Sequence, residues 1–434
     1  MTDLLNLPGL TVDPARTAEA DGRLTIGVMR RPKPDWSCNH CRGSDLVPNG
    51  TRTVCYADLP VRGMSVTLEW DRQRYRCKAC GKSTPDRHPE LHEDFLMTRR
   101  LYKWIGARCL GNTFAAVAKD VGMDERSVRR VFDQWSGERL KDLQFDTPKW
   151  LGVDEVHLLH HPRGILCDIH EKCLIDMLPT RSQETMGLRL SQFRERDRTE
   201  VVAMDMWVPY RRLAANLFPQ ATTVVDKWHV TKYADKGMET IRKSYRAKLP
   251  AGLRRQLVKD RFLLLSRAHR LKPEQQMVME TWTNTFPDLA DAYATKEAFY
   301  GIYDSPDRST AEAAMTKWES SLTPDMRVAF SDLLSALRNW HDPIFNYFDH
   351  RVTNAYTESI NGLVKIANRA GRGYSFDVLR ARMLLARKAF KYAGVPVAMA
   401  PSGARSRAAG MHIPTLIDHF THGDLGFVPT AFAG

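Results

Sequence analysis

Residues 199–210 read TEVVAMDMWVPY, a run of apolar residues that leads into Asp205. A second stretch, WLGVDEVHLL at 150–159, surrounds Asp154 with apolar neighbours in the same way. Short apolar runs bounded by turn residues predict β-strands. We therefore expect Asp154 to lie within one strand and Asp205 at the C-terminal end of a later one.

The surrounding segments alternate between strand and helix patterns. GILCDIHEKCLIDMLP (164–179) predicts further strands, RSQETMGLRLSQF (181–193) and 210–217 predict helices, and ATTVVDKWHV (221–230) predicts a strand that ends near Asp226. This alternation predicts a mixed sheet covered by helices. From about 233 to 348 the pattern is helical and is interrupted by prolines.

Buried carboxylates are costly unless they are paired or bound to a metal. Asp154 and Asp205 on adjacent strands would form a site for hard divalent cations, which prefer oxygen ligands. The alternative for each acid is that it caps a neighbouring helix or pairs with an Arg.

A third acid is expected from RVTNAYTESINGLVKIANRAGRGYSF (351–376), which predicts an amphipathic helix. Helical spacing places four polar side chains on the face opposite its apolar residues. A solvated stripe is the alternative, although it does not require this mixture of amide, carboxylate and ammonium groups. The four residues are Asn354, Glu358, Asn361 and Lys365.

Four of the eight cysteines form two CxxC pairs, Cys38 with Cys41 and Cys77 with Cys80. Two residues between cysteines allow a turn to point both thiolates at one centre, and two such turns supply the four soft ligands of a closed zinc site. The 35 residues between the pairs are enough for two or three short strands. The alternatives are an accidental match and a redox-active dithiol.

A helix-turn-helix is predicted within residues 96–140. Asn112 and Thr113 offer a cap for one apolar-faced helix, Gly122 ends that helix, and Asp124 can cap the next. The second helix projects basic side chains near its N-terminus, as insertion into the major groove of DNA requires. A helical hairpin without DNA contact is the alternative. The residues expected to face DNA are Arg126, Ser127, Arg129 and Arg130.

The 434 residues include 64 Lys and Arg against 51 Asp and Glu, a net charge of +13 that favours a polyanionic partner. Residues 363–407 include ten basic residues and one acid. This excess of positive charge favours DNA binding, and an ordinary basic surface is the alternative. We expect Arg380, Arg382 and Arg387 to contact DNA phosphates beside the active site.

No run approaches the roughly 18 apolar residues of a membrane span, and the start MTDLLNLPGL lacks the basic residues of a signal peptide. We expect a soluble cytoplasmic protein that associates with the nucleoid when it is bound to DNA. No glycine-rich phosphate loop occurs in the sequence, so no nucleotide cofactor is expected.

The sequence resembles bacterial insertion-sequence transposases of the DDE type, specifically the ISL3 family. The resemblance lies in the order of its motifs: the two CxxC pairs, the helix-turn-helix, GVDEVH, VVAMDMWVPY, VVDKWHV and TNAYTESINGLVK. The resemblance implies a multidomain chain with an N-terminal zinc-binding module, a helix-turn-helix and an α/β RNase H-like catalytic domain with a helical insertion. It implies Asp154, Asp205 and Glu358 as the catalytic triad. Lys365 matches the spacing of a Lys in several DDE transposases, whereas Asn354 stands where those families place an Arg.

The resemblance also implies a reaction: the protein binds the terminal inverted repeats of its element, cleaves the DNA ends and joins them to a target. Mg²⁺ or Mn²⁺ ions would serve this reaction, with Asp154 bridging two ions and Asp205 and Glu358 each holding one. Asp226 and His229 are expected to support the triad.

The expected partners are double-stranded DNA and, because two transposon ends must be paired, at least one further copy of the chain. Two alternatives are a DNA-binding regulator with an inert RNase H-like domain and a nuclease that cuts without joining. The insertion could contact DNA or another protomer.

The expected boundaries are an N-terminal arm at 1–34, the zinc-binding module at 35–92, the helix-turn-helix at 96–140, the two parts of the catalytic core at 147–232 and 349–400, the insertion at 233–348 and a C-terminal tail at 401–434.

Overall fold

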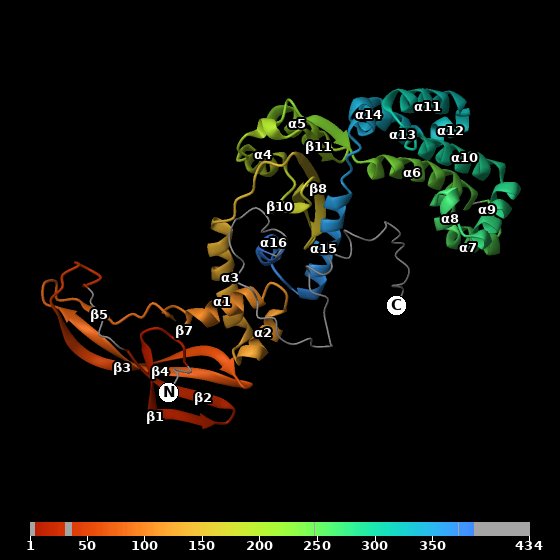
Figure 1. The fold of residues 1–434 in the computed structure, drawn as a ribbon. Helices are drawn as coiled ribbons and strands as arrows, with labels where there is room; N and C mark the ends of the chain where they lie inside the picture. The colour runs from red at the N-terminus through yellow and green to blue at the C-terminus, as the bar shows by residue number, and fades with distance from the viewer. Residues whose placement is uncertain (1–4, 31–36, 247, 372, 386–434) are drawn as a thin grey trace. The chain divides into compact units, whose positions relative to one another are not determined.

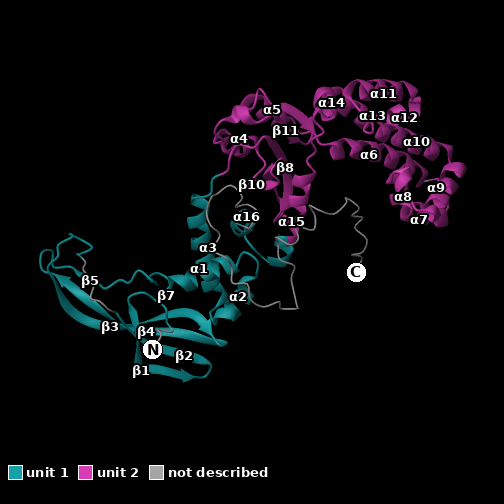
Figure 2. Ribbon diagram, in the orientation of Figure 1, with its two compact units in different colours: residues 1–144, 367–434 teal, residues 145–366 magenta. Residues whose placement is uncertain are grey.

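The structure is a computed structural model that describes residues 5–30, 37–246, 248–371 and 373–385 (Figure 1). The chain divides into two compact units, which Figure 2 shows in different colours. The first unit combines residues 1–144 with residues 367–434, and the second comprises residues 145–366. The first unit is therefore assembled from two distant parts of the sequence.

A mixed sheet forms the N-terminal part of the first unit. Its long hairpin consists of β3 (Leu46–Val61) and β4 (Met64–Cys77), and β2 (Arg23–Arg30) runs parallel to the other edge of β4. Strand β1 (Leu10–Ala20) pairs with β2 in the antiparallel direction. The remaining strands described in this sheet are β5 (Ser83–Pro85), β6 (Leu91–His92) and β7 (Met97–Thr98).

The sequence predicts an N-terminal arm at 1–34, but β1 and β2 within this range pair into the same sheet as β3 and β4 of the zinc-binding module. The physical reason is that β4 has two hydrogen-bonding edges, and β2 satisfies the edge that β3 leaves open. Val66, Leu68 and Trp70 alternate along β4 and face a core that they share with Tyr56 and Val28.

The predicted helix-turn-helix follows this sheet as α1 (Arg99–Arg108), α2 (Phe114–Val121) and α3 (Glu125–Lys141). The predicted caps are confirmed, because the side chains of Thr113 and Asp124 accept hydrogen bonds from backbone N–H groups three residues later. Gly122 ends α2 with a φ of +66°, a conformation that favours glycine. A further helix, α16 (Phe376–Leu385), packs against α3 in the same unit.

The second unit contains a mixed sheet with the described strand order β10-β9-β8-β11-β12. Strands β8 (Trp150–Leu158), β9 (His161–Asp168) and β10 (Cys173–Leu178) are antiparallel, whereas β11 (Val201–Met204) and β12 (Thr222–Val225) run parallel to β8. Helices α4 (Gln183–Ser191) and α5 (Val208–Leu217) lie between the strands in sequence. This topology confirms the predicted RNase H-like fold class.

A helical insertion separates β12 from α15 (Ala355–Gly371), the helix that carries Glu358. Pro273, Pro287 and Pro324 each occupy the first helical position, where a missing N–H costs nothing. The helices of the insertion are α6 (Lys227–Arg246), α7 (Ala251–Lys259), α8 (Arg261–Leu265), α9 (Pro273–Thr285), α10 (Pro287–Ile302), α11 (Arg308–Ser321), α12 (Pro324–Ala329), α13 (Ser331–Asn339) and α14 (His341–His350).

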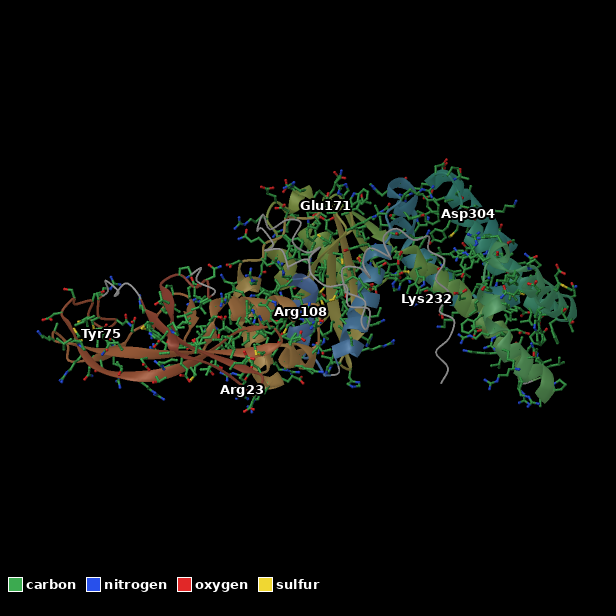
Figure 3. All side chains as sticks on the ribbon, turned by 60° about the horizontal axis from the view of Figure 1, so that its bottom comes forward. Arg23, Tyr75, Arg108, Glu171, Lys232 and Asp304 are labelled. Carbon is green, nitrogen blue, oxygen red and sulfur yellow. The ribbon has the colours of Figure 1, made fainter. Side chains whose placement is uncertain are left out.

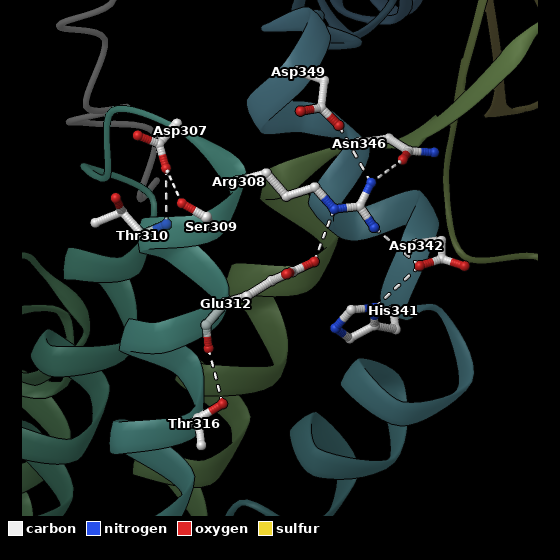
Figure 4. Close-up of polar contacts among 10 residues, drawn as sticks. All are labelled: Asp307, Arg308, Ser309, Thr310, Glu312, Thr316, His341, Asp342, Asn346 and Asp349. Carbon is white, nitrogen blue, oxygen red and sulfur yellow. Dashed lines mark hydrogen bonds and ion pairs between the residues drawn. The ribbon is translucent and has the colours of Figure 1, made fainter.

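Arg308, at the start of α11, holds the end of the insertion together (Figure 4). Its guanidinium group donates hydrogen bonds of 2.8 to 3.3 Å to acceptors on both α11 and α14, namely Glu312, Asp342, Asn346 and Asp349. Asn346 also donates to the carbonyl oxygen of Thr223 in β12 at 2.9 Å. Helix α14 thereby covers β12, the edge strand of the sheet. The end of the insertion therefore lies beside the sheet.

Candidate active site and zinc centre

Three acids come together where the parallel strands end. Strand β11 pairs in register with both β8 and β12, so Asp205, directly after β11, lies between Asp154 of β8 and Asp226, directly after β12. The N–H of Asp226 donates to the carbonyl oxygen of Met204 at 2.9 Å, which extends this register. The predicted placement of Asp154 and Asp205 on adjacent strands is confirmed.

Gly152 allows α15 to approach β8 closely. A Cβ at this position would overlap Thr357 Oγ1 and Asn354 Oδ1 at the beginning of α15, so any larger residue would push the helix away from the strand. Asn354 is fully buried and donates from Nδ2 to the carbonyl oxygen of Val153 at 3.2 Å. These contacts place Glu358 beside the acids of the sheet.

The polar face predicted for α15 is directed partly at β8. Asn361 donates from Nδ2 to Asp154 Oδ2 at 2.8 Å and to the carbonyl oxygen of Glu155 at 3.1 Å, whereas Lys365 is exposed. Of the four residues that helical spacing groups, Glu358 and Asn361 lie beside Asp154. Asn354, at the beginning of this face, binds the backbone of β8 instead of lining the carboxylate edge.

Burial and mutual repulsion raise the pKa values of these acids. Burial, followed by the nearby charges of Asp205 and Asp226, raises the pKa of Asp154 to about 7. Burial, followed by Asp226 and Asp154, raises the pKa of Glu358 to about 7. Burial and the Glu155 carboxylate raise the pKa of Asp205 to about 6. The acids therefore share a region in which negative charge is poorly solvated.

A second group of candidate metal ligands consists of Asp226, His229 and Glu358. Their candidate ligand atoms all lie within 4.8 Å of one another. Burial, reinforced by the charge of Lys232, lowers the pKa of His229 to about 4, so its imidazole is neutral at neutral pH. The sequence predicts only a supporting position for Asp226 and His229, whereas in the structure both lie close to Glu358.

Several buried oxygen atoms in this region have no hydrogen-bond partner within the described residues. Such orphaned acceptors are uncommon, because the loss of water is not repaid. Hard divalent cations accept this kind of oxygen-rich ligand set, so the residues fit the divalent cation expected for a DDE site. The unpartnered atoms are Asp205 Oδ1, Asp226 Oδ2, Glu358 Oε1 and Asn361 Oδ1.

A pocket of about 290 Å³ gives access to this region. It is lined by both apolar and charged side chains from the end of β11 and from α6. Lys232, labelled in Figure 3, is exposed, and its ammonium group lies 3.0 Å from the centre of the Trp228 ring. Positive charge beside buried carboxylates suits a phosphate-containing substrate. The lining residues are Asp205, Met206, Trp207, His229, Lys232, Tyr233 and Lys236.

Sequence reasoning missed Glu155 and Arg181 at this site. Their side chains form an ion pair, and the Arg181 guanidinium lies 4.6 Å from the centre of the Trp207 ring. Glu155 acts on Asp205 through its charge. Its position directly after Asp154 in GVDEVH was the available signal, but strand alternation argues that neighbours face opposite sides of a sheet.

The four predicted zinc ligands meet in the first unit. Sγ of Cys38 lies 3.6 Å from Sγ of Cys80, and Sγ of Cys41 lies 3.5 Å from Sγ of Cys77. A tetrahedral zinc ion with bonds of about 2.3 Å requires sulfur atoms about 3.8 Å apart. Backbone N–H groups of Cys41 and His40 lower the pKa of Cys38 to about 6, which favours the thiolate form. The cluster therefore fits a structural zinc ion.

The basic residues predicted on α3 differ in their surroundings. Arg126 is exposed near the beginning of the helix, and the N–H of Ser127 is bound to the Asp124 cap. The guanidinium of Arg129 lies 5.2 Å from the centre of the Phe114 ring, and that of Arg130 lies 5.7 Å from the centre of the Phe95 ring. The side chains of Arg129 and Arg130 are thus partly held by aromatic contacts.

Arg382 does not have the position that the sequence analysis expects. It is 5% exposed and donates to the carbonyl oxygens of Cys109 and Asn112 and to the hydroxyl of Tyr374. These bonds satisfy carbonyl groups left open beyond the end of α1, so Arg382 is engaged inside the protein and we no longer include it among the DNA contacts. Arg380 is partly exposed. Arg387 and the tail at 401–434 lie outside the described residues.

Comparison with protein families agrees with this arrangement. Residues 34–80 match the zinc finger of transposases IS204/IS1001/IS1096/IS1165, and residues 94–136 match the helix-turn-helix domain of transposase family ISL3. Residues 151–383, more than half of the chain, match the ISL3 DDE domain, described as a transposase. The chain belongs to the ISL3 transposase family. No curated protein matches it.

The parts of this ISL3 transposase correspond to those predicted: a zinc-binding module, a helix-turn-helix and a transposase domain. The two N-terminal domains identify a DNA-binding protein, and the third identifies an enzyme that processes DNA. None of the described helices is long and apolar enough to span a bilayer.

The cysteine cluster predicts the effect of removing one ligand. Cys38→Ser or Cys80→Ser should abolish stoichiometric zinc binding and unfold the zinc-binding module, because a four-thiolate site contributes directly to folding. Elemental analysis and thermal unfolding would measure both effects. Cys55→Ser is the control, since Cys55 is exposed and lies outside the cluster. Full zinc content in Cys80→Ser would refute the assignment.

The close approach at Gly152 predicts that Gly152→Ala destabilises the second unit by about 1–3 kcal/mol, since the added methyl group must displace α15. Urea unfolding would measure the change. Gly252→Ala is the control, because a Cβ at that position meets no atom within 4 Å and alanine favours a helix. Equal stability of the two variants would show that α15 does not need an unsubstituted position 152.

Proposed function

We propose that this transposase binds the terminal inverted repeats of its insertion sequence, cleaves the DNA at those ends, and joins the ends to a target by metal-dependent strand transfer. The proposal is supported by the position of Asp154, which lies beside Asp205 of the adjacent strand and close enough to Glu358 of α15 to raise its pKa, and by the oxygens of Asp205 and Glu358 that have no hydrogen-bond partner among the described residues. Asp154 is buried and Asp205 and Glu358 are half-buried, and carboxyl groups with raised pKa values in such surroundings are well suited to act as metal ligands.

Asp154, Asp205 and Glu358 would hold Mg²⁺ or Mn²⁺. Such cations lower the pKa of an attacking water or hydroxyl and neutralise charge on the leaving oxygen. Asn361 orients Asp154 through its 2.8 Å hydrogen bond, and the packing of α15 on β8 fixes the position of Glu358. Lys232 and Lys236 line the pocket beside Asp205 and attract the scissile phosphate.

Two displacements at phosphorus complete the reaction. In the first, water attacks at the transposon end, the bond from phosphorus to the 3′ oxygen breaks, and a 3′-hydroxyl is released. In the second, that hydroxyl attacks a target phosphodiester and displaces one strand end of the target. The second step exchanges one phosphodiester for another and requires no nucleotide cofactor.

The two N-terminal domains would bring the DNA ends to this site. The exposed N-terminal part of α3, with Arg126 and Arg129, is proposed to read bases in the major groove, and Ser127 and Arg130 to contact the adjoining backbone. Arg380 remains a candidate phosphate contact. Pairing of two transposon ends requires at least a dimer on double-stranded DNA.

Two other functions compete with this one. A DNA-binding regulator with an inert domain has no need for a complete set of buried, partly unpartnered acids, and this observation disfavours it. A nuclease that cuts without joining would use the same acids. A strand-transfer assay separates the nuclease from the transposase, because only the transposase yields a covalent joint between transposon end and target.

The carboxylates predict a set of inactive variants that still bind DNA. Asp154→Ala, Asp205→Ala or Glu358→Ala should each reduce Mg²⁺-dependent cleavage of a terminal inverted repeat by at least about a thousandfold, the scale of several kcal/mol for lost metal catalysis. Gel-shift assays should show unchanged end binding. Asp197→Ala, at an exposed acid in the same unit, should cleave normally. Cleavage by any triad variant would exclude the proposed reaction.

Base reading by α3 predicts a specific loss of affinity. Arg126→Ala or Arg129→Ala should weaken binding to the element's own end by about 1–3 kcal/mol and binding to random DNA much less. Fluorescence anisotropy at fixed salt would measure both affinities. Lys119→Ala, at the exposed end of α2, is the control. Equal weakening on both DNAs would indicate phosphate contacts.

A further inference from the structure

We propose that Asp226, His229 and Glu358 form a divalent-cation site of mixed oxygen and nitrogen ligands, distinct from the all-oxygen pair Asp154 and Asp205 beside it. Asp226 and His229 then act as direct ligands, and Glu358 is shared by the two parts of the site. The use of this cation in catalysis rests on the proposed function, whereas its binding does not.

The first argument is geometric. Ligands of one cation, with bonds of about 2.0–2.3 Å, lie no more than roughly 4.6 Å apart. The candidate atoms of these three residues lie within 4.8 Å of one another, and small side-chain movements bridge that difference. Among the described residues, the only other group of this kind is the cysteine cluster that fits zinc.

The second argument concerns how the ligands are held. Asp226 lies directly after β12 and His229 lies in the first turn of α6, where the His229 N–H donates to the Asp226 carbonyl oxygen at 3.1 Å. Glu358 comes from α15, which the contact at Gly152 holds against β8. The β12–α6 junction and helix α15 therefore carry the three ligands, so the site requires little ordering when a cation binds.

The third argument concerns unsatisfied atoms. Asp226 is 3% exposed, yet its Oδ2 has no hydrogen-bond partner, and neither does Oε1 of Glu358. A buried carboxylate and a half-buried one so close together favour either a shared proton or a cation. His229 favours the cation, because its ring nitrogen offers a third ligand that a shared proton would not use.

The ligand types predict which metal binds. Mg²⁺ favours oxygen ligands and usually retains several waters, whereas imidazole nitrogen suits softer divalent ions. A site with two carboxylates and one imidazole should therefore prefer Mn²⁺ over Mg²⁺. The pocket that reaches His229 provides an entry path from solvent.

The decisive measurement is electron spin echo envelope modulation of Mn²⁺ bound to the full-length protein, because it detects a nitrogen nucleus coupled to the ion. We expect nitrogen coupling in the wild type and in His269→Gln, a control at an exposed histidine of the insertion. His229→Gln should lose the coupling and bind this Mn²⁺ at least about tenfold more weakly, with little change in affinity for Mg²⁺. Asp226→Asn should lower the affinity of the protein for the same Mn²⁺ ion.

The proposal is overturned if wild-type Mn²⁺ shows no nitrogen coupling, or if the coupling persists in His229→Gln. Circular dichroism of each variant would establish that it is folded. The proposed function fails separately, if Asp154→Ala still cleaves DNA in Mg²⁺. Nitrogen coupling together with active Asp154→Ala would retain the cation site and reject the DDE reaction. If wild-type Mn²⁺ shows no nitrogen coupling and Asp154→Ala is inactive, the DDE reaction is retained and the mixed-ligand cation site is rejected.

Discussion

Helix α15 can lie against β8 only because position 152 carries no side chain. Asn354 and Asn361 then reach the strand with their amide groups, and Glu358 comes beside acids that precede it by more than a hundred residues. Like charges oppose this arrangement. Ile360, Leu363 and Val364 on the same helix are almost fully buried, and each contributes about 1.5–3 kcal/mol through burial. Apolar packing therefore holds together carboxylates that would otherwise separate.

Carboxylates held close together in this way favour the binding of a cation. With pKa values of about 7 for Asp154 and Glu358, protons and metal ions compete for the same oxygens near neutral pH. Protonation increases as the pH falls, and each bound proton removes a ligand from the cation. Lys232 reduces the repulsion from one side, but it is exposed and does not replace a bound ion. The protein environment thus favours metal binding.

Local patterns in the sequence predicted the features that depend on neighbouring residues. Caps at Thr113 and Asp124, the glycine stop at 122 and strand-end acids such as Asp205 all follow from a few adjacent positions. Contacts between distant segments were not predictable in this way. Pairing of β2 with β4 depends on which edge is open, and the burial of Arg382 depends on carbonyl groups that lie far from it in the sequence. A count of basic residues treats Arg382 as surface charge, although its donors are occupied inside the protein.

The packing of α16 on the helix-turn-helix has a consequence for the order in which the protein is made. Tyr374 contacts Phe114, and Arg382 completes the end of α1, so the DNA-binding unit needs residues that emerge from the ribosome after the whole catalytic unit. At about 5–20 residues per second, this delay lasts tens of seconds. During that time the helix-turn-helix lacks part of its core. A nascent or truncated chain that ends before α16 therefore carries an unfinished DNA-binding unit, and the complete unit arises only in a chain that already contains the whole second unit.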